Sequence, residues 1–396
     1  MALAHPLSEP FQLPISPLAA ATASAGLVLL VAFTVPSAMG RSRGGQALQV
    51  ASWAGTVSAA QLVTRAVAVA VLALAIAAGR LGTPDELENL APALVVGALW
   101  PLVVLASVSL GAVWRWIDPW DSVARVLASS HEPEDGSGHV WPAVVVAVGW
   151  VWYLGAYRDT LDPRSVGTIL ALYTLLTVGG SLALGRVRWL SSAEPFGILL
   201  SWMALVPRRR LTGWSPPRGA EALLGVFAGG VLFGAVRRSE LWGGLNTSQE
   251  AEIYAAVGVV LFCAAAAGLL MLMALAAQQV GARAVAARAA VPAVAGIIVA
   301  VAMDRNRLTT SVQLLPELFG DPFGRGWNLL GRSGTALDPA PFGDTGLVTA
   351  QLALLLTGHV IGAVVVGRCL EREDRGPVAL LLAVLASASV IGVVSH

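Results

Sequence analysis

The chain has 396 residues, of which 56% are hydrophobic and only 12% are charged. A soluble domain is typically about 45–50% apolar and about 25% charged, so this composition excludes an ordinary water-soluble globule. The net charge of +1 provides no clustered basic surface for nucleic acid, and two cysteines are too few for a disulfide framework or a cysteine-rich metal site. The composition therefore predicts a polytopic membrane protein that is surrounded by the lipid bilayer.

Ten apolar segments approach the roughly 20 residues that a helix needs to cross about 30 Å of hydrocarbon. They predict an all-α fold, a polytopic transmembrane bundle of about ten helices with short interfacial helices, in one membrane domain over residues 1–396. In chain order the segments are Leu18–Met39, Gln61–Gly79, Ala91–Trp114, Val140–Tyr157, Val166–Gly185, Gly219–Val236, Ile253–Gln279, Ala289–Met303, Thr345–Gly367 and Pro377–Ser395.

One further apolar run, Pro195–Pro207, is too short to cross the bilayer and suits an interfacial or re-entrant segment. If it does not cross, most arginines of the chain lie on one side of the membrane, as the positive-inside rule requires. This predicts a multi-pass protein of the cytoplasmic (inner) membrane with both termini extracytoplasmic. Residues 115–139 and 186–218 are then cytoplasmic interfacial segments, and 304–344 form a long extracytoplasmic loop.

Two carboxylates follow the third predicted span. Asp118 suits a helix N-cap, Pro119 suits the first helical turn, and Asp121 lies three residues after the cap. This pattern favours a short surface helix anchored by aromatic residues of the interfacial belt. The alternative is that Asp118 and Asp121 form a cation site or a catalytic pair. The expected anchors are Trp114, Trp116 and Trp120.

The most distinctive polar passage lies in the long loop, between Asp321 and Asn328. Asp, Pro and Gly at its first, second and fourth positions favour a type I turn. Arg325 lies two residues before Trp327, and the pair is suited to binding an anion or stacking on an aromatic group. The alternative interpretation is a rigid chain reversal at the membrane surface.

His359 lies inside the ninth predicted span, and Gln351 falls on nearly the same helix face. An ionisable residue within the membrane is a candidate functional residue. His359 also stands between Gly358 and Gly362, a spacing of small residues that is typical of close helix packing. The sequence leaves open whether His359 is functional or is hydrogen-bonded within a packing contact.

Buried acidic residues are predicted to be nearly absent, because Glu221 and Glu252 lie only at the edges of the predicted spans. Proton-coupled transporters usually place carboxylates within the bilayer, so this absence argues against ion coupling. No set of metal ligands at a recognised spacing is present, and no cofactor can be identified.

Six short motifs lie between Arg115 and Arg372, namely Asp118-Pro-Trp120, Trp141-Pro-Ala143, Ala193-Glu-Pro-Phe-Gly197, Pro216-Pro-Arg-Gly219, Asp321-Pro-Phe-Gly-Arg-Gly-Trp327 and Gly358-His-Val360. Together they resemble motifs of the fenitrothion hydrolase-like polytopic membrane proteins of high-GC bacteria. This resemblance implies a membrane-embedded hydrolase that cleaves organophosphate triesters. The family pattern carries further histidines in the span before the long loop. Ala289–Met303 contains none, so only His359 carries over from that polar set.

Three functions are compatible with these features. The first is a non-catalytic subunit or scaffold that assembles with another membrane protein or with a second copy of the chain, and the scarcity of ionisable residues favours it. The second is a permease for an apolar or zwitterionic small molecule, with a polar cavity near His359 and Gln351. The third is a hydrolase, which requires His359 to converge with Asp321, Arg325 or Asp118.

Overall fold

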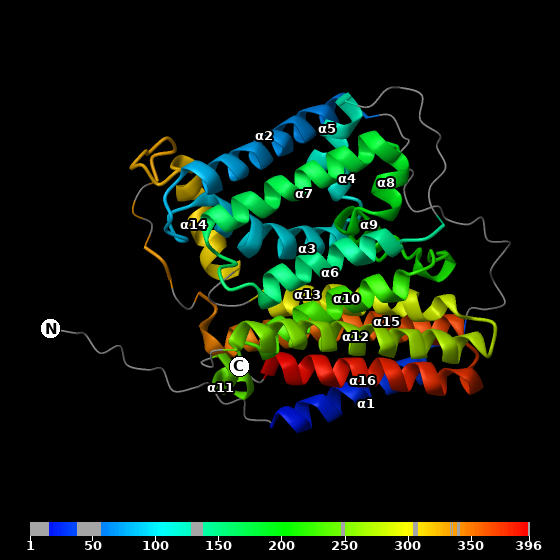
Figure 1. Ribbon diagram of the computed structural model, residues 1–396. Coiled ribbons are helices and arrows are strands. Elements are labelled where there is room, and N and C mark those ends of the chain that lie inside the picture. The colour runs from blue at the N-terminus through cyan, green and yellow to red at the C-terminus, as the bar shows by residue number, and fades with distance from the viewer. Residues whose placement is uncertain are drawn as a thin grey trace.

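The computed structural model describes residues 16–37, 57–127, 138–246, 250–303, 308–332, 334, 336–338 and 341–394. Within these residues the regular structure is helical and contains no strand, so the protein is an all-α polytopic bundle, as predicted (Figure 1). Each of the ten predicted spans corresponds to an apolar helix. The predicted ends of the first span at Met39 and of the last at Ser395 lie outside the described residues.

Eight of the helices in the described part of the chain are long and apolar enough to cross a membrane, and two more are apolar but shorter. The third span is continuous but changes type, because it begins as a π-helix and continues as an α-helix. The long helices are α1 (Pro17–Thr34), α2 (Ala59–Leu81), η2 with α3 (Pro92–Leu99 and Trp100–Leu110), α7 (Pro163–Leu184), α12 (Ala251–Gln278), α13 (Ala284–Ala302), α15 (Gly343–Cys369) and α16 (Arg375–Val394), and the two shorter ones are α6 (Trp141–Ala156) and α10 (Ala220–Val236).

Short helices connect the long ones. α9 corresponds to the apolar run that was predicted to be interfacial or re-entrant, and all but one of its nine residues are buried. It packs against α3, α6 and α13, so protein rather than lipid surrounds it. The short helices are α4 (Trp114–Ile117), α5 (Pro119–Leu127), α8 (Arg186–Ser192), α9 (Pro195–Met203), η3 (Leu211–Gly213), α11 (Glu240–Asn246), α14 (Thr310–Gly320) and η5 (Arg372–Asp374).

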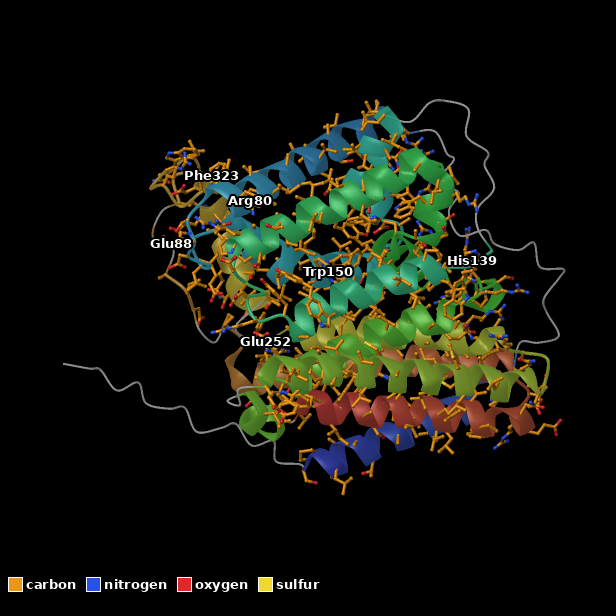
Figure 2. All side chains as sticks on the ribbon, viewed as in Figure 1. Arg80, Glu88, His139, Trp150, Glu252 and Phe323 are labelled. Carbon is orange, nitrogen blue, oxygen red and sulfur yellow. The ribbon has the colours of Figure 1, made fainter. Side chains whose placement is uncertain are left out.

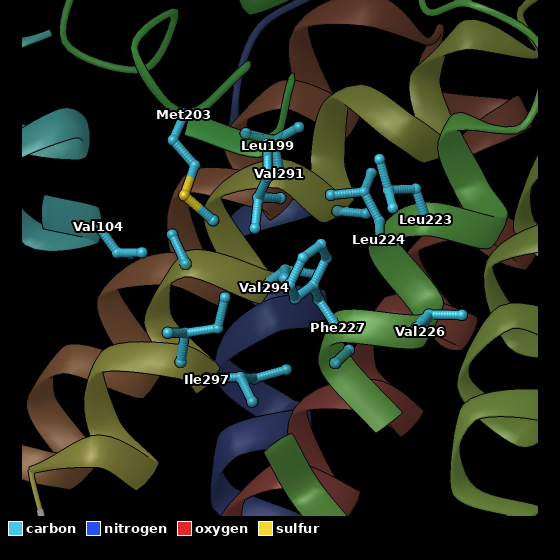
Figure 3. Packing of buried hydrophobic residues seen from close by; sticks show 14 of the residues in the cluster. Val104, Leu199, Met203, Leu223, Leu224, Val226, Phe227, Val291, Val294 and Ile297 are labelled. Atoms are coloured by element: carbon cyan, nitrogen blue, oxygen red, sulfur yellow. The ribbon is translucent and has the colours of Figure 1, made fainter. Parts of the chain in front are cut away.

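The long helices run roughly alongside one another, with α2 and α7 at one edge of the bundle and α1 and α16 at the opposite edge (Figure 1). α13 is the most central helix, because nearly all of its residues are buried. Its small residues let neighbouring helices approach closely. Apolar side chains of α9, α10 and α13 meet in this core, and Phe227 lies between α10 and α13 (Figure 3).

The two ends of the bundle carry different residues. Figure 2 shows Arg80, Glu88, Glu252 and Phe323 at one end and His139 at the other, with Trp150 between them. These are called the Arg80 end and the His139 end below. α6 and α10 both begin at the His139 end, where the Val140 N–H donates to the carbonyl of Arg218 at 2.9 Å. Both helices therefore finish at the Arg80 end, which the sequence predicts to be extracytoplasmic.

Candidate functional site

A cavity of about 670 Å³ lies between η2–α3, α6, α9, α10 and α13. This volume is within the range of small-molecule binding sites. Its wall is mostly apolar and aromatic, and it includes Trp100 on α3, Trp150 on α6 and Phe227 on α10. The wall extends from the Arg80 end, where α6 and α10 finish, to α9 in the other half of the bundle. The cavity is therefore elongated along the helices.

The η2–α3 wall has an unusual backbone. Val96 and Gly97 line the cavity from the π-helical part, and Pro101 lines it from the first turn of α3. Pro101 has no N–H, so the carbonyl one turn earlier loses its helical donor. π-helical turns occur frequently at functional sites. This wall therefore combines an irregular backbone with apolar side chains, which is typical of a ligand site.

Three arginines supply all the charge among the described residues that line the cavity, and they lie where α6 and α10 end. Arg158 is exposed in the connection between α6 and α7. Arg237 and Arg238 follow the last residue of α10, and Arg237 donates to the carbonyl of Gly155 at 2.6 Å. Glu252, at the start of α12, is near enough for its charge to interact with Arg237. The mouth of the cavity is therefore cationic.

Phe196 on α9 closes the inner end of the cavity. Its ring centroid is 3.9 Å from that of Trp100 and 5.3 Å from that of Trp150. Another face of the same ring contacts Tyr173 of α7, with centroids 5.4 Å apart. Tyr173 does not line the cavity. Phe196 therefore separates the cavity from the side chains behind it.

Behind Phe196, at the His139 end, lies a cluster of charged residues around Asp121. Arg65 of α2 and Arg186 of α8 each donate to the Asp121 carboxylate at 2.6 Å, and Arg125 lies at 3.4 Å. Arg65 also donates to the carbonyl of Arg115. Asp121 is fully buried, so these arginines replace its hydration. The cluster joins α2, α5 and α8.

Two more buried carboxyls adjoin this cluster. Asp118 caps α5, as predicted, since its Oδ1 accepts from the N–H groups of Trp120 and Asp121 at 3.0 and 2.9 Å. Its Oδ2 is buried and has no hydrogen-bond partner among the described residues. Glu194 caps α9 by accepting from the N–H groups of Phe196 and Gly197 at 3.1 and 2.6 Å. The hydroxyl of Tyr173 also donates to Glu194.

These groups correct two expectations from the sequence. The prediction that acidic residues are nearly absent from the interior was wrong, because Asp118, Asp121 and Glu194 are all buried. The expectation that three tryptophans lie in the interfacial belt was also wrong in part. Of these three, Trp114 and Trp120 are buried in the protein, and only Trp116 is exposed. Hydropathy places a residue at a membrane depth but does not tell whether lipid or protein surrounds it there.

The loop around Asp321 is tied to the α2–η2 connection. The carboxylate of Asp321 accepts from the N–H groups of Arg325, Gly326 and Trp327 at 2.6–3.0 Å. The Arg325 guanidinium lies over the rings of Phe323 and Trp327. The carbonyl of Phe323 accepts from the Thr83 N–H at 2.9 Å. These contacts favour the rigid reversal, since Asp321 and Arg325 are engaged within the loop.

His359 and Gln351 lie on α15, and neither lines the cavity. Gln351 donates to the carbonyl of Met303 at 3.1 Å. His359 Nδ1 contacts the carbonyl of Leu355 in its own helix at 2.9 Å, and its Nε2 is buried without a partner among the described residues. His359 therefore shares no hydrogen-bond partner with Asp118, Asp321 or Arg325, the residues that the hydrolase hypothesis places beside it.

We expect His359→Gln to leave the protein folded, with a free energy of unfolding within about 1.5 kcal/mol of the wild type, because glutamine keeps a side-chain N–H and an apolar stem of similar length. Thermal unfolding in a mild detergent measures this change. A loss of folding would show instead that the buried Nε2 has a required partner.

Some of these residues could have been found from the sequence and others could not. Arg65 lies within a predicted span, which by itself marks it as a candidate. Glu194 precedes Pro195, and proline is typical of the first helical position, which marks the start of a helix there. The convergence of Arg158 and Arg237 at one cavity has no local signal, because these residues follow different helices and meet only in the tertiary structure.

Comparison of the chain with protein-family models gives no match, and comparison with curated proteins and with solved structures gives none. Among the described residues, no group of three or more His, Cys, Asp or Glu side chains is arranged to hold a metal ion. The function must therefore be inferred from the chemistry of the cavity itself.

Proposed function

We propose that this protein binds an anionic amphiphile in the cavity between η2–α3, α6, α9, α10 and α13. The apolar part of the ligand lies along the cavity, and its anionic head group lies among the arginines at the mouth. This places the protein among membrane proteins that hold or carry a lipid-like molecule. The observation that carries the proposal is an apolar cavity in which arginines are the only charged residues among the described residues of the lining.

The size and composition of the cavity support the apolar part of this ligand. Burying a methylene group contributes about 0.8 kcal/mol relative to water, although the gain is smaller when the ligand comes from lipid. Selection from the bilayer therefore depends on shape and on the head group. Aromatic rings such as Trp100 and Trp150 give the wall a fixed shape along which a chain can lie.

The arginines support the anionic head group. A guanidinium stays charged at any physiological pH and forms paired hydrogen bonds with phosphate, sulfonate or carboxylate oxygens. Arg158 and Arg237 come from different elements, so a head group between them would be held from two sides. The described residues of the lining also include no Asp or Glu, which would repel such a group.

The same lining favours binding over catalysis. A hydrolase requires a nucleophile or an activated water and a base within reach of the ligand. The described lining residues include the hydroxyl of Thr160 but no His, Cys, Asp or Glu. The hydrolase and scaffold hypotheses therefore receive no support from this site, whereas a permease-like function does, with an anionic rather than zwitterionic ligand.

The proposal can be tested with a photoactivatable dodecyl sulfonate that carries a diazirine near the end of its chain. The protein is purified in a neutral detergent, irradiated with this probe, and the labelled peptides are mapped by mass spectrometry. We expect labels on residues at the inner end of the cavity, such as Leu199 and Phe227. The corresponding dodecyl alcohol should label them more weakly, because it lacks the charge that Arg158 and Arg237 bind.

Two variants make the test specific. Arg158→Gln combined with Arg237→Gln should lower sulfonate labelling of the cavity about tenfold or more, which corresponds to about 1.4 kcal/mol or more. Gly234→Leu should abolish labelling by both probes. Gly234 lines the cavity, and a Cβ there would have as its nearest neighbour Arg238 Nη1 at 3.8 Å, so the leucine can fill the cavity without disturbing α10.

Two matched control variants make the same changes outside the cavity: one removes an arginine charge, and the other adds a leucine side chain. Arg164→Gln removes an exposed arginine near the start of α7. Gly149→Leu adds the same side chain to the outer face of α6, where a Cβ meets nothing within 4 Å. Both should label like the wild type. Labels confined to lipid-facing residues, or equal labelling of all variants, would contradict the proposal.

A further inference from the structure

We propose that Glu194 and Asp118 form a proton-binding site behind the cavity and that the proton controls ligand binding through Phe196. This inference rests on the proposed function, because it concerns the regulation of the same cavity. Both carboxyls are buried, and neither lines the cavity. The ligand of this second site is a hydrogen ion that exchanges near neutral pH.

Glu194 links the site to the cavity. Its side chain is 1% exposed, and it accepts from the N–H groups of Phe196 and Gly197, the first free donors of α9. The ring of Phe196 closes the cavity and contacts the ring of Trp100. The hydroxyl of Tyr173 donates to the same carboxyl, and its ring contacts Phe196. Glu194 therefore holds the part of α9 that forms the inner end of the cavity.

Asp118 provides the second carboxyl. It is 1% exposed and near enough to Glu194 for the two charges to interact. Its Oδ2 has no partner among the described residues, whereas Oδ1 is held by two backbone N–H groups. A buried carboxylate with an unpartnered oxygen is unfavourable, because the lost hydration of the charge is not replaced. When two buried carboxyls are near each other, the repulsion between their charges favours keeping a proton on one of them.

The nearby arginines do not neutralise this pair directly. Arg65, Arg125 and Arg186 donate to Asp121, and Arg65 also donates to a backbone carbonyl. The carboxyl groups of Asp118 and Glu194 instead accept from backbone N–H groups, and Glu194 also accepts from the hydroxyl of Tyr173. Of the helices packed against α9, α3 has no ionisable residue. The charged and titratable groups carried by α5 and by the helices packed against α5 and α9 are Arg65 and Arg80 (α2), Arg115 (α4), Asp121 and Arg125 (α5), Tyr153 (α6), Arg164 and Tyr173 (α7), Arg186 and Arg188 (α8) and Arg288 (α13).

The environment supports proton exchange near neutrality. Burial raises the pKa of Glu194 to about 7, although the bonds from Tyr173, Gly197 and Phe196 lower it. Burial also raises the pKa of Asp118 well above its usual value, with further increases from the charges of Asp121 and Glu194. Glu194 is therefore the group whose charge changes between mildly acidic and mildly alkaline solution.

The direction of the effect follows from the cap. Ionised Glu194 accepts from the first turn of α9 and interacts favourably with the helix dipole. Protonation weakens both interactions, so the first turn loosens and Phe196 loses its fixed position. The ligand head group lies at the opposite end of the cavity, so direct repulsion from Glu194 is weak. We therefore expect tighter binding when Glu194 is ionised.

The same photolabelling assay tests this inference, because a sulfonate stays charged across the pH range. Cavity labelling of the wild type should fall several-fold from pH 8 to pH 6. Glu194→Gln should remove the pH dependence, whereas Asp118→Asn should keep it with a midpoint close to that of the wild type, because Asp118 remains protonated at the pH where Glu194 ionises. Glu221→Gln is the matched control, since Glu221 is also buried in the first turn of a helix, and its profile should follow the wild type.

Infrared spectroscopy of the purified protein without ligand provides a second readout. The band of protonated carboxyl groups should decrease as the pH rises through neutrality, and this change should be smaller in Glu194→Gln. Cavity labelling that is independent of pH would overturn the inference and leave the proposed function intact. Absence of cavity labelling at every pH would overturn the proposed function and the coupling. An infrared change that neither substitution alters would overturn the proton site itself.

Discussion

Replacing Gly358 with leucine is expected to separate α13 from α15 and to remove most of the stability of the protein in detergent. A Cβ at Gly358 would overlap the carbonyl oxygen of Pro292 and lie 3.1 Å from the Cα of Gly296. These are backbone atoms of the central helix, so they cannot rotate away. Overpacking a core with extra methylenes costs about 1–3 kcal/mol. Because the whole helix must move here, we expect a loss of about 3 kcal/mol or more.

Thermal unfolding in a mild detergent measures this loss. Gly346→Leu is the matched control, because it lies on the same helix and its Cβ would meet only an ordinary contact at 3.6 Å. The control should unfold close to the wild-type temperature. If the Gly358 variant does so as well, the close approach of α13 and α15 is not needed for stability, and the small-residue spacing around His359 has another purpose.

Asp121→Asn is expected to have the second large effect. The substitution preserves the shape of the side chain but removes the charge that faces Arg65 and Arg186. Removing one partner of a buried ion pair typically costs about 3–5 kcal/mol, because the other charge stays buried and unpaired. Both arginines are nearly buried, so they cannot turn into water. We expect destabilisation in this range, measured by thermal or denaturant unfolding in detergent.

A double-mutant cycle distinguishes a network from a general loss of packing. Arg65→Gln combined with Asp121→Asn should cost clearly less than the sum of the two single changes, because the double variant leaves fewer unpaired charges. Asp85→Asn serves as a control, since Asp85 is exposed in the α2–η2 connection and should have little effect. Additive costs in the cycle would show that the arginines and Asp121 do not stabilise each other.

The bundle was largely predictable because hydropathy acts locally. A chain that crosses lipid forms a helix because the helix pairs all of its backbone hydrogen-bonding groups, and the crossing requires about 20 apolar residues in succession. Such a run can be recognised directly in the sequence, as in Ala251–Gln278. Asp118 as an N-cap was predictable for a related reason, since a cap and its free N–H groups lie within three residues of each other. The close packing at Gly358 also followed from a short spacing.

The site was not predictable in the same way. Arg65, Asp121 and Arg186 are separated by more than fifty residues from one another, and no local pattern indicates that they meet. The hypothesis of a polar cavity near His359 and Gln351 used membrane depth, whereas the observed cavity lies between other helices. The order of apolar residues along the chain indicates how deep each residue lies in the membrane. It does not indicate which helices lie next to each other in the membrane plane.

The sequence by itself determined that this is an all-α membrane protein, roughly where its long apolar helices lie, and which small residues allow close packing. The tertiary structure alone decided which helices surround the cavity, that arginines gather at its mouth, and that the buried Asp118 and Glu194 are near enough for their charges to interact. The physical reason is that burial in lipid depends on the local run of side chains. Burial against protein depends instead on which helices become neighbours, and that is settled only when the whole bundle packs.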